Sequence, residues 1–423
     1  MGRLKISKRF SFGIFAAVLL GCLIGSQSIP SNRSYADAPQ EGSVPVLNVK
    51  DYGAVGNGVH DDTSAIQQAV NEALTKKGTV YLPSGDYNVT SQINIGGAGF
   101  ITIQGAGGTT MQSNINATLA SGNVFEVTSS YLVKFKDVAI NNYSSSGRIV
   151  SFTSGESHSI ENVRMTNTPG NTSDMVYFIG AFTQILSSGF INNEPTAYAL
   201  HVTSLPTQLN INSNIFDNGF GSTGKGILVD AAPGTRPEGL KISRNNFILT
   251  GVEQITLKTI LHVDISNNML DQSSGAAILL DPEGLALNGV FIDDNYISAA
   301  QNQQEGIGIH APLKNEGVTN SVITNNMISY NGYGIVFNSN ASNVNISNNV
   351  ISDVHHAGIK IDQSRSTTIK GNMFSAAAAS LSIADGPNGG PFIIKDNQLT
   401  GSNTITRTNK KKFFIGDNPG LDW

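Results

Sequence analysis

One short strand pattern in this 423-residue chain repeatedly ends in a side chain that could do chemistry. Each copy has five residues: a small or polar residue, Ile, a variable residue, an apolar residue and a polar one. The polar fifth residues form one series along the sequence: Asp230, Lys258, Asp281, His310, Asn338 and Asp362. Carboxylate, imidazole and ammonium groups exchange protons and stabilise charge near neutral pH. A reaction site is therefore sought first in this series.

The pattern also predicts on which side of its strand each residue lies. Successive side chains of a strand point to opposite faces, so the second and fourth residues point inward and the third and fifth outward. If the strands stack about 4.8 Å apart, Lys258, Asp281 and His310 occupy neighbouring levels of one exposed column. Lys360 precedes Asp362 by two residues and shares its face. We predict a reaction centre of these four residues, Asp281, His310, Lys258 and Lys360. A solvated face of alternating charge is the competing interpretation.

The strands that must position this column belong to a repeat. The phrase Ile, two polar residues, Asn, any residue and a large apolar residue recurs at Asn214, Asn245, Asn268, Asn295, Asn326, Asn349, Asn372 and Asn397. Their spacings are 31, 23, 27, 31, 23, 23 and 25 residues, and weaker copies at Val138, Val163 and Ser188 extend the series upstream. A period in the twenties without a helix-length apolar face is typical of a solenoid of strands. The sequence predicts an all-β fold, a single parallel β-helix of about eleven or more coils.

The repeated asparagine is interpreted as a structural residue. Asn tolerates the left-handed backbone conformation that tight turns require. Identical Asn side chains stacked in register can also form a hydrogen-bonded ladder. We therefore expect this column to support stability and not to bind a ligand.

Composition agrees with many short strands and tight turns. Charged residues make up 13% of the chain, and 45 glycines stand against 14 prolines. A solenoid grows without a thicker core, so residues 47–423 need be only one domain. The net charge of −5 gives no general attraction for nucleic acid or an anionic membrane.

Residues 1–38 are predicted to be a signal peptide, followed by a polar linker at 39–46. Arg3, Lys5, Lys8 and Arg9 precede an apolar run at 12–24, and Ala36–Ala38 offers a cleavage site. The run is too short to span a membrane comfortably. Leu19–Cys22 resembles a bacterial lipoprotein box, so lipid anchoring through Cys22 is an alternative to simple secretion. Export leaves a mature chain without disulfides if Cys22, the sole cysteine, is removed.

A short helix is predicted over residues 63–75. Asp62-Thr-Ser is a good helix start, and Ile66, Val70 and Leu74 recur at helical spacing. A helix laid across the open end of a solenoid covers its apolar core and its unpaired strand edge. We expect this helix to cap the first coil.

The same region carries a family resemblance. Asp51-Tyr-Gly-Ala, Asp61-Asp62-Thr and Val80-Tyr-Leu-Pro-Ser-Gly-Asp-Tyr87 closely resemble the start of the pectate-lyase-like superfamily, which includes polygalacturonase-like hydrolases, polysaccharide lyases, uronan epimerases and phage tailspikes. The resemblance covers residues 47–90 and extends loosely through the repeat. It implies a right-handed β-helix that acts on an extracellular polysaccharide. Asp61 and Asp62 belong to this signature and are interpreted as capping residues.

On such a fold, the outward column would contact a glycan laid along the coils. Contacts to substrate are predicted for Asp230, Asn338, Asp362 and His356. Gly306 and Gly308 beside His310 would leave room for a groove. His201, outward in Leu200-His-Val202, is a weaker member of the same face.

The preferred reaction is β-elimination on a uronate polymer. A base removes the proton next to a uronate carboxylate while a cation stabilises the enolate. His310, Lys258 and Lys360 supply base and cation. No cofactor is specified, although three carboxylates, those of Asp230, Asp281 and Asp362, could hold a Ca²⁺ ion that bridges to the substrate.

Three alternatives stay open. A uronan epimerase shares the first step, and Asp281-Pro-Glu283 resembles the Asp-Pro-His-Glu motif of alginate epimerases without its histidine. An inverting hydrolase needs two carboxylates about 6.5–9.5 Å apart, and Asp230 and Asp281 lie two levels, about 9.6 Å, apart. The polygalacturonase motifs are not reproduced; Ile307–His310 and Gly358–Lys360 only echo two of them. The third alternative is a glycan-binding surface protein without catalysis, although few aromatic residues are available for sugar stacking.

Overall fold

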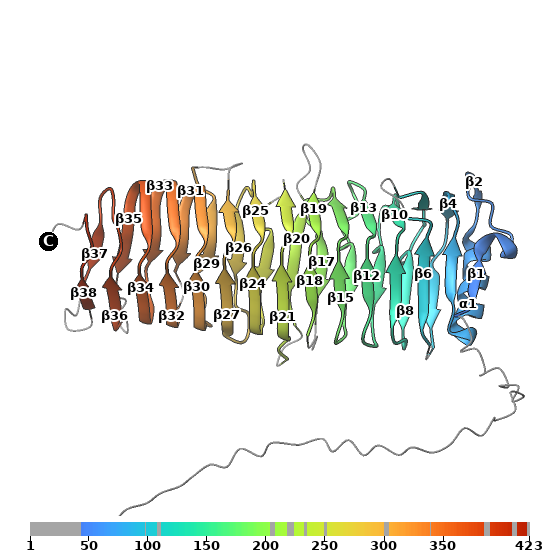
Figure 1. Ribbon diagram of the computed structural model, residues 1–423, viewed down its shortest axis with the longest axis horizontal. Helices are drawn as coiled ribbons and strands as arrows, with labels where there is room; N and C mark the ends of the chain where they lie inside the picture. The colour runs from blue at the N-terminus through green and yellow to red at the C-terminus, as the bar shows by residue number, and fades with distance from the viewer. Residues whose placement is uncertain are drawn as a thin grey trace, which may run out of the picture. The chain divides into compact units, whose positions relative to one another are not determined.

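The chain folds as a parallel β-solenoid of about 13 turns in the computed structural model. The structure describes residues 44–420 except 98, 108–110, 204–207, 218–223, 232–234, 249–251, 300–303, 339, 385–389 and 408–412. Every pairing between its named strands is parallel, in one sheet of 15 strands and one of 23. Figure 1 shows the coils stacked from the N-terminal helix to the last strand. The predicted all-β, right-handed β-helix is confirmed.

The 15-stranded sheet takes the first strand of each coil. Its members in order are β1 (Val46–Asn48), β3 (Thr79–Leu82), β6 (Ile101–Gly105), β9 (Val133–Lys136), β12 (Ser159–Glu161), β15 (Gln184–Leu186), β18 (Asn210–Asn212), β21 (Glu238–Ser243), β24 (Leu261–Ser266), β27 (Leu287–Asp293), β30 (Val318–Thr324), β32 (Ala341–Ser347), β34 (Ser364–Lys370), β36 (Phe392–Lys395) and β38 (Phe413–Gly416). A turn then leads into the 23-stranded sheet.

The 23-stranded sheet takes two strands from most coils. The strands after the first turn are β2 (Asn57–Asp61), β4 (Gly85–Val89), β7 (Ser113–Ala117), β10 (Ala139–Asn142), β13 (Arg164–Asn167), β16 (Gly189–Asn192), β19 (Ile215–Asp217), β22 (Asn246–Ile248), β25 (Met269–Asp271) and β28 (Tyr296–Ser298). The last strands of the coils are β5 (Ile93–Gly96), β8 (Phe125–Thr128), β11 (Val150–Phe152), β14 (Val176–Phe178), β17 (Tyr198–Val202), β20 (Lys225–Val229), β23 (Ile255–Leu257), β26 (Ala276–Leu280), β29 (Ile307–Ala311) and β37 (Thr404–Thr406). In three C-terminal coils the two strands merge into β31 (Met327–Phe337), β33 (Val350–Ile361) and β35 (Met373–Ala384).

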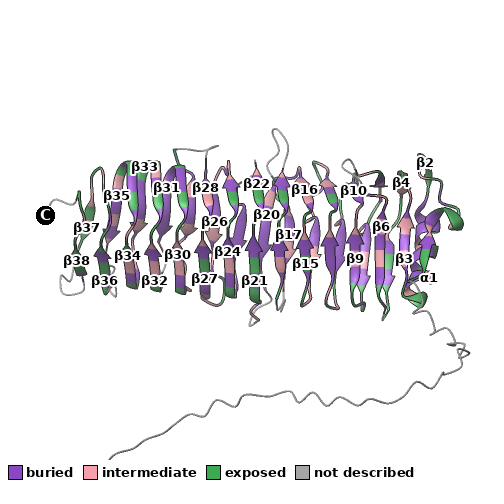
Figure 2. Cartoon of the chain, in the orientation of Figure 1, coloured by how far each residue is buried: buried purple, intermediate pink, exposed green. Residues whose placement is uncertain are grey.

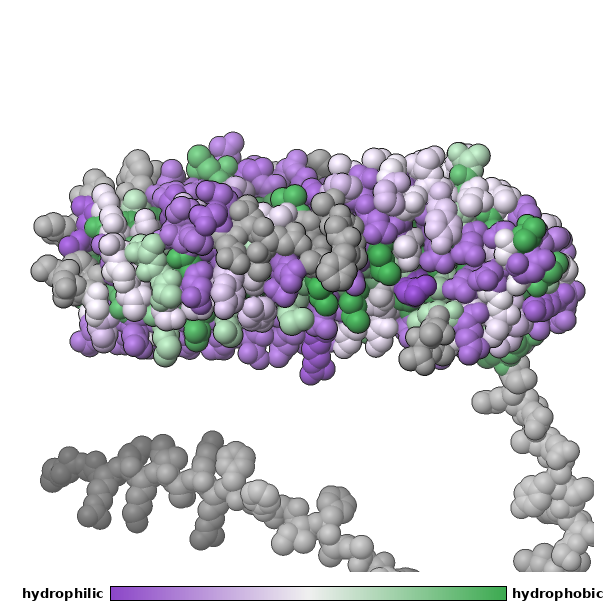
Figure 3. Space-filling view, turned by 90° about the horizontal axis from the view of Figure 1, so that it is seen from above, coloured by the Kyte–Doolittle hydropathy of each residue, from purple (hydrophilic) through white to green (hydrophobic). Residues whose placement is uncertain are grey.

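The core is a set of stacked apolar side chains. Inward residues of successive coils meet in register, as Phe190, Phe216 and Phe247 do with stacked rings 5.1 and 4.5 Å apart. Figure 2 shows buried residues along every coil, with exposed ones concentrated at turns and outward positions. On the face seen in Figure 3, polar residues predominate and apolar ones lie in small groups. The solenoid therefore buries its apolar side chains against those of the neighbouring coils.

The asparagine ladder is present and longer than predicted. From Asn214 to Asn418, each side-chain amide donates to the next Asn Oδ1 at 2.9–3.0 Å. Each amide also donates to a backbone carbonyl, such as that of Ile292 for Asn326. The expectation that the ladder residue itself is left-handed is wrong. The residue before it takes positive φ, for example Asn325 and Asn348, because the chain must turn just before the amide enters the core.

Replacing Asn326 with alanine should lower the free energy of unfolding by about 1–3 kcal/mol. The substitution removes the acceptor of the buried Asn295 amide groups on one neighbouring coil and the donor to Asn349 Oδ1 on the other. Asn246→Ala, at an exposed position of β22, is the matched control and should be nearly neutral. Chemical unfolding would measure both changes. An Asn326→Ala protein that is as stable as the parent would contradict the structural role of the ladder.

The N-terminal cap contains the predicted helix. α1 covers Thr63–Lys76, against a prediction of 63–75, and a short 3-10 helix, η1 (Val49–Tyr52), precedes it. Asp62 accepts hydrogen bonds from the backbone N–H groups of Val55 and Gly56, and Asp61 from that of Thr63. Both carboxylates are thus occupied in the cap, as expected.

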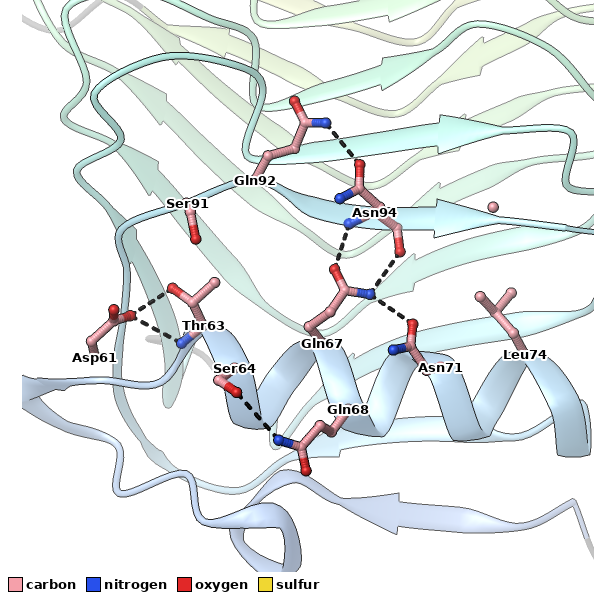
Figure 4. A pocket seen from close by; sticks show the side chains of 11 residues that line it. Asp61, Thr63, Ser64, Gln67, Gln68, Asn71, Leu74, Ser91, Gln92 and Asn94 are labelled. Carbon is pink, nitrogen blue, oxygen red and sulfur yellow. Dashed lines mark hydrogen bonds between the residues drawn. The ribbon is translucent and has the colours of Figure 1, made fainter.

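Figure 4 shows how α1 closes the exposed edge of β5. Gln67 Oε1 accepts from the Asn94 backbone N–H at 2.7 Å, and Gln67 Nε2 donates to the Asn94 carbonyl at 3.0 Å. The side-chain amide therefore makes the two hydrogen bonds that a neighbouring strand would make. This contact removes a free strand edge from the end of the solenoid.

The predicted signal peptide, 1–38, and Cys22 lie outside the described residues, as does most of the linker. The first strand begins at Val46. Within the described part of the chain, no helix is both long and apolar enough to cross a membrane.

Candidate functional site

The candidate face consists of the outward side chains on the last strand of each coil. Register places Val229 beside Leu257 and Leu257 beside Leu280, so Asp230, Lys258 and Asp281 follow at successive levels. Phe337 pairs with Ile361, which brings Asn338 beside Asp362. Five of the six predicted members therefore share one column.

The predicted place of His310 in that column is wrong. His310 pairs with Leu279 and Val336, so it lies in the column that contains Lys360, two residues before the Asp281 column. The level after Asp281 is occupied by Pro312. A slip of two residues keeps every side chain on its face, so the alternation of apolar residues does not reveal it. His310 still points outward beside Asp281, but on a diagonal.

The predicted groove-forming role of Gly308 is also wrong. Gly308 is buried, and a Cβ there would lie 2.7 Å from the Gly334 carbonyl oxygen and 2.9 Å from Ile328 Cγ2. The glycine is required because the next coil approaches closely on the inside. It creates no space on the outer face.

His310 belongs to a chain of hydrogen bonds across three coils. Its Nε2 lies 3.1 Å from Asn338 Oδ1, and Asn338 Nδ2 donates to Asp362 Oδ2 at 2.5 Å. Because the Asn338 oxygen can only accept, His310 must donate from Nε2 when it is neutral. The Nδ1 atom then carries the lone pair. Asn338 and Asp362 therefore select one tautomer of the imidazole.

The electrostatic surroundings favour the neutral form of His310. Burial lowers the pKa of His310 below its ordinary value, and the positive charge of Lys360 acts in the same direction. The hydrogen bond to Asn338 and the charge of Asp281 oppose this shift without cancelling it. A neutral imidazole with a defined lone pair can accept a proton.

The second half of the centre surrounds Lys258. Its Nζ lies 3.1 Å from Glu283 Oε2. Burial lowers the pKa of Lys258, but the hydrogen bond to Glu283 and the charges of Asp230 and Asp281 outweigh burial, so its pKa is raised. Asp281 is in turn 2.8 Å from Lys314 Nζ. The ammonium of Lys258 is therefore held as a fixed positive charge.

The remaining predicted residues form the C-terminal side of the centre. Lys360 Nζ lies 3.5 Å from Asp362 Oδ2 and 5.8 Å from the centre of the Tyr333 ring. His356 stacks at a tilt on Tyr333, with 4.7 Å between ring centres, and lies 3.9 Å from Glu305. His356 thus packs on Tyr333, whose ring also lies beside Lys360.

The three carboxylates suggested for Ca²⁺ do not form a metal site. Lys258 occupies the level between Asp230 and Asp281, and Asp362 lies three levels beyond Asp281. Among the described residues, no three His, Cys, Asp or Glu side chains are grouped as metal ligands. The expected Ca²⁺ set therefore does not fit this arrangement, and no step is assigned to a metal ion.

A second charged cluster, which the sequence analysis missed except for His201, lies upstream on the same face. His201 Nδ1 is 2.6 Å from Asp174 Oδ2, and the His201 and Tyr177 rings meet edge to face at 5.2 Å. The Arg148 guanidinium lies 4.2 Å from the centre of the Tyr177 ring. We call these four residues the upstream cluster.

The upstream cluster continues toward His310. Lys225 Nζ is 3.1 Å from Glu253 Oε2 and 5.1 Å from the centre of the Tyr198 ring. Register runs from His201 through Leu228, Thr256 and Leu279 to His310, so the two histidines share a column four levels, about 19 Å, apart. The weak repeats at Val138, Val163 and Ser188 mark the coils of the upstream cluster. Extending the strand alternation upstream from Ile227 would have revealed the cluster.

Comparison with known proteins identifies the class. A family model described as "Rhamnogalacturonase A/epimerase, pectate lyase-like" matches residues 46–246, and one described as "Right handed beta helix region" matches residues 250–416. Together with the observed solenoid and its helical cap, these matches define a right-handed β-helix protein of pectate-lyase-like fold. Residues 46–246 therefore form a domain of the pectate-lyase-like type.

Similarity to individual proteins is short in sequence and broad in structure. Mannuronan C5-epimerase AlgE5 of Azotobacter vinelandii is 59% identical over 44 residues, which are 10% of this chain and 4% of that protein. The catalytic unit of a GH87 alpha-1,3-glucanase from Streptomyces thermodiastaticus superimposes with a TM-score of 0.62 at 15% identity, over 92% of this chain and 72% of that one. PfbA, a surface adhesin of Streptococcus pneumoniae, gives a TM-score of 0.56 at 15% identity, over 88% and 89%. At such identities the structural matches show the shared fold.

Proposed function

We propose that this protein is a secreted polysaccharide lyase that cleaves a uronate-containing polymer by β-elimination. The observation that carries the proposal is the hydrogen-bonded His310, held in one tautomer by Asn338, on one face with Lys258 and Lys360. Elimination needs a base for the proton on C5 and positive charge for the carboxylate beside it. Lys258 lies two levels before His310 and Lys360 two levels after it, about 9.6 Å along the stack in each direction.

In the proposed reaction, His310 Nδ1 removes the proton from C5 of the uronate. The C5–H electron pair becomes the C4=C5 double bond, the bond from C4 to the glycosidic oxygen breaks, and that oxygen takes a proton from water. Lys258 and Lys360 stabilise the negative charge that builds on the carboxylate. The negative charge of Asp281 opposes the effect of the Lys360 charge on His310. Asp230, Asn338, Asp362 and His356 contact the polymer.

The family match and the short similarity to a mannuronan C5-epimerase support a uronate substrate. Epimerisation begins with the same proton removal and is the closest alternative. Hydrolysis has less support, because Asp281 is paired with Lys314 and Asp230 faces Lys258, whereas a hydrolase needs one carboxyl free to donate a proton. Because the fold is also that of a surface adhesin, polysaccharide binding without turnover is a further possible result of the test.

The upstream cluster is a second candidate for the reaction centre. Arg148, Tyr177 and His201 place a cation, a phenol and an imidazole on three adjacent coils. Under the proposal, this cluster instead binds carboxylates of the same polymer about four levels away from His310. Separate substitution of the two histidines distinguishes these roles.

A panel of polygalacturonate, polymannuronate, polyguluronate and a glucuronan tests the proposal. Elimination gives an unsaturated product that absorbs near 235 nm. New reducing ends without that absorbance would instead identify hydrolysis, and exchange of the C5 proton for deuterium without cleavage would identify epimerisation. Binding without any of these changes would contradict catalysis.

The pH dependence of the reaction should follow His310. Its pKa is lowered, so the base stays neutral until the pH falls below its ordinary range, and kcat/KM should decline on that acid side. Asp281→Asn removes a charge that raises this pKa and should move the acid limb to lower pH. Lys360→Gln removes a charge that lowers it and should move the limb to higher pH. An acid limb unchanged in both variants would show that another group is the base.

Export is proposed from the N-terminal 38 residues. Mass spectrometry of the mature protein from the culture medium should find an N-terminus near Pro39 and no residues of the leader. A lipid-modified Cys22 in the membrane fraction would instead favour the lipoprotein alternative.

A further inference from the structure

The 15-stranded sheet carries an aromatic side chain where the solenoid does not need one. Phe291 lies near the middle of β27 and is 44% exposed, between Val290 and Ile292, which are buried. Its register neighbours are Asp264 on β24 and Val322 on β30. The ring is therefore not covered by the adjacent coils.

The exposed ring forms part of a shallow hollow of about 560 Å³. The lining residues are Asp264, Phe291, Asp293, Val322, Thr324 and Asn325. Asp293 Oδ1 accepts from Asn325 Nδ2 at 2.9 Å, and Asp264 lies 3.6 Å from Lys241 Nζ. Both carboxylates are thereby positioned at the sides of an apolar floor made by Phe291 and Val322.

This combination matches the chemistry of a neutral sugar ring. A pyranose presents a C–H face that packs on an aromatic ring and a rim of hydroxyl groups that carboxylates accept well. The described residues that line the hollow include two carboxylates and no Lys or Arg. Lys241 offsets the charge of Asp264, but Asp293 still leaves the hollow negative, and a uronate would add a further negative charge. The ligand class therefore differs from that of the candidate face.

We infer that the Phe291 hollow is a second carbohydrate-binding site, specific for neutral polysaccharide. It lies on the 15-stranded sheet, whereas His310 lies on the 23-stranded sheet. The site therefore holds the protein on a neutral glycan while the other face remains open. This inference does not depend on the proposed reaction, because binding is measured without turnover.

Affinity electrophoresis of the full chain in gels containing hydroxyethyl cellulose, xylan, galactomannan or dextran tests the inference. At least one polymer should retard the parent protein, and Phe291→Ala should weaken that binding by about tenfold or more. Asp293→Ala, which keeps the ring but removes an acceptor, should weaken it as well. Ile393→Ala is the matched control, since Ile393 is exposed in the same outward column far from the carboxylates.

The expected pattern is loss of retardation in the Phe291 and Asp293 variants and none in the Ile393 variant. All three should degrade or bind uronate polymers as the parent does. Absence of retardation by every neutral polymer, or equal retardation of parent and Phe291→Ala, would overturn the inference. So would full competition by a uronate polymer, because the binding would then belong to the candidate face.

Discussion

Replacing His310 with alanine should reduce kcat/KM on the uronate substrate by about 100-fold or more. Alanine removes the one imidazole that the chain Asp362–Asn338–His310 holds in a defined tautomer. The side chain is outward, so its loss leaves no cavity in the core. The rise in absorbance near 235 nm would give the rate, and thermal unfolding would show whether the fold is intact.

Two further variants make this result specific. Asn338→Ala leaves the imidazole but frees its tautomer, so it should cost much less than His310→Ala. His201→Ala should mainly raise KM, because the upstream cluster is proposed to bind and not to react. A folded His310→Ala protein with near-parent kcat/KM, together with an inactive His201→Ala protein, would move the reaction centre to the upstream cluster.

The fold could be predicted because its signals repeat. Asn295, Asn326 and Asn349 occupy one ladder, and each repeat confirms the position of the next. The ladder amide must reach both a neighbouring amide and a backbone carbonyl, which is possible only at one register. The period therefore determines the coils, and Thr63–Lys76 was recognisable as a helix because its apolar spacing changes from two to nearly four residues.

The candidate site was less predictable because its register is not determined by burial. Ile307 and Ile309 are both apolar and separated by two residues, so either could have stacked on Ile278. The structure selects Ile309, and this choice moves His310 next to Leu279. The choice between two registers that differ by two residues depends on the turn length and on close contacts between coils, such as that of Gly308 with Gly334. A local sequence pattern contains neither.

The upstream cluster was missed for a different reason. Its residues occur where the ladder position is Val138, Val163 or Ser188, so the repeat phrase is weak. Asp174 lies in the loop before β14, the short strand of Tyr177, and Arg148 lies in the loop before β11, one coil earlier. Their contacts cross two coils and become visible only once the coils are stacked.

Replacing Lys258 or Lys360 with glutamine should lower kcat by about tenfold each, and the double variant by about 100-fold. Negative charge grows on the uronate carboxylate as the C5 proton leaves, so the two ammonium groups are worth more in the transition state than in the bound ground state. Lys258 is held among Asp230, Asp281 and Glu283, and Lys360 by Asp362. Both charges are therefore in place before the substrate arrives.

The measurement is kcat on a short uronate oligomer, with KM determined in the same series. Lys395→Gln is the matched control. Lys395 is an exposed lysine on the 15-stranded sheet that pairs with Asp396, so its replacement should change neither kcat nor KM. Removal of Lys258 leaves Asp230 and Glu283 without this neighbouring cation, whereas Asp281 keeps Lys314, so unfolding must be followed in parallel. If the two lysine variants instead raise KM and leave kcat intact, the ammonium groups only bind the polymer, and charge stabilisation during proton removal must come from elsewhere on the face.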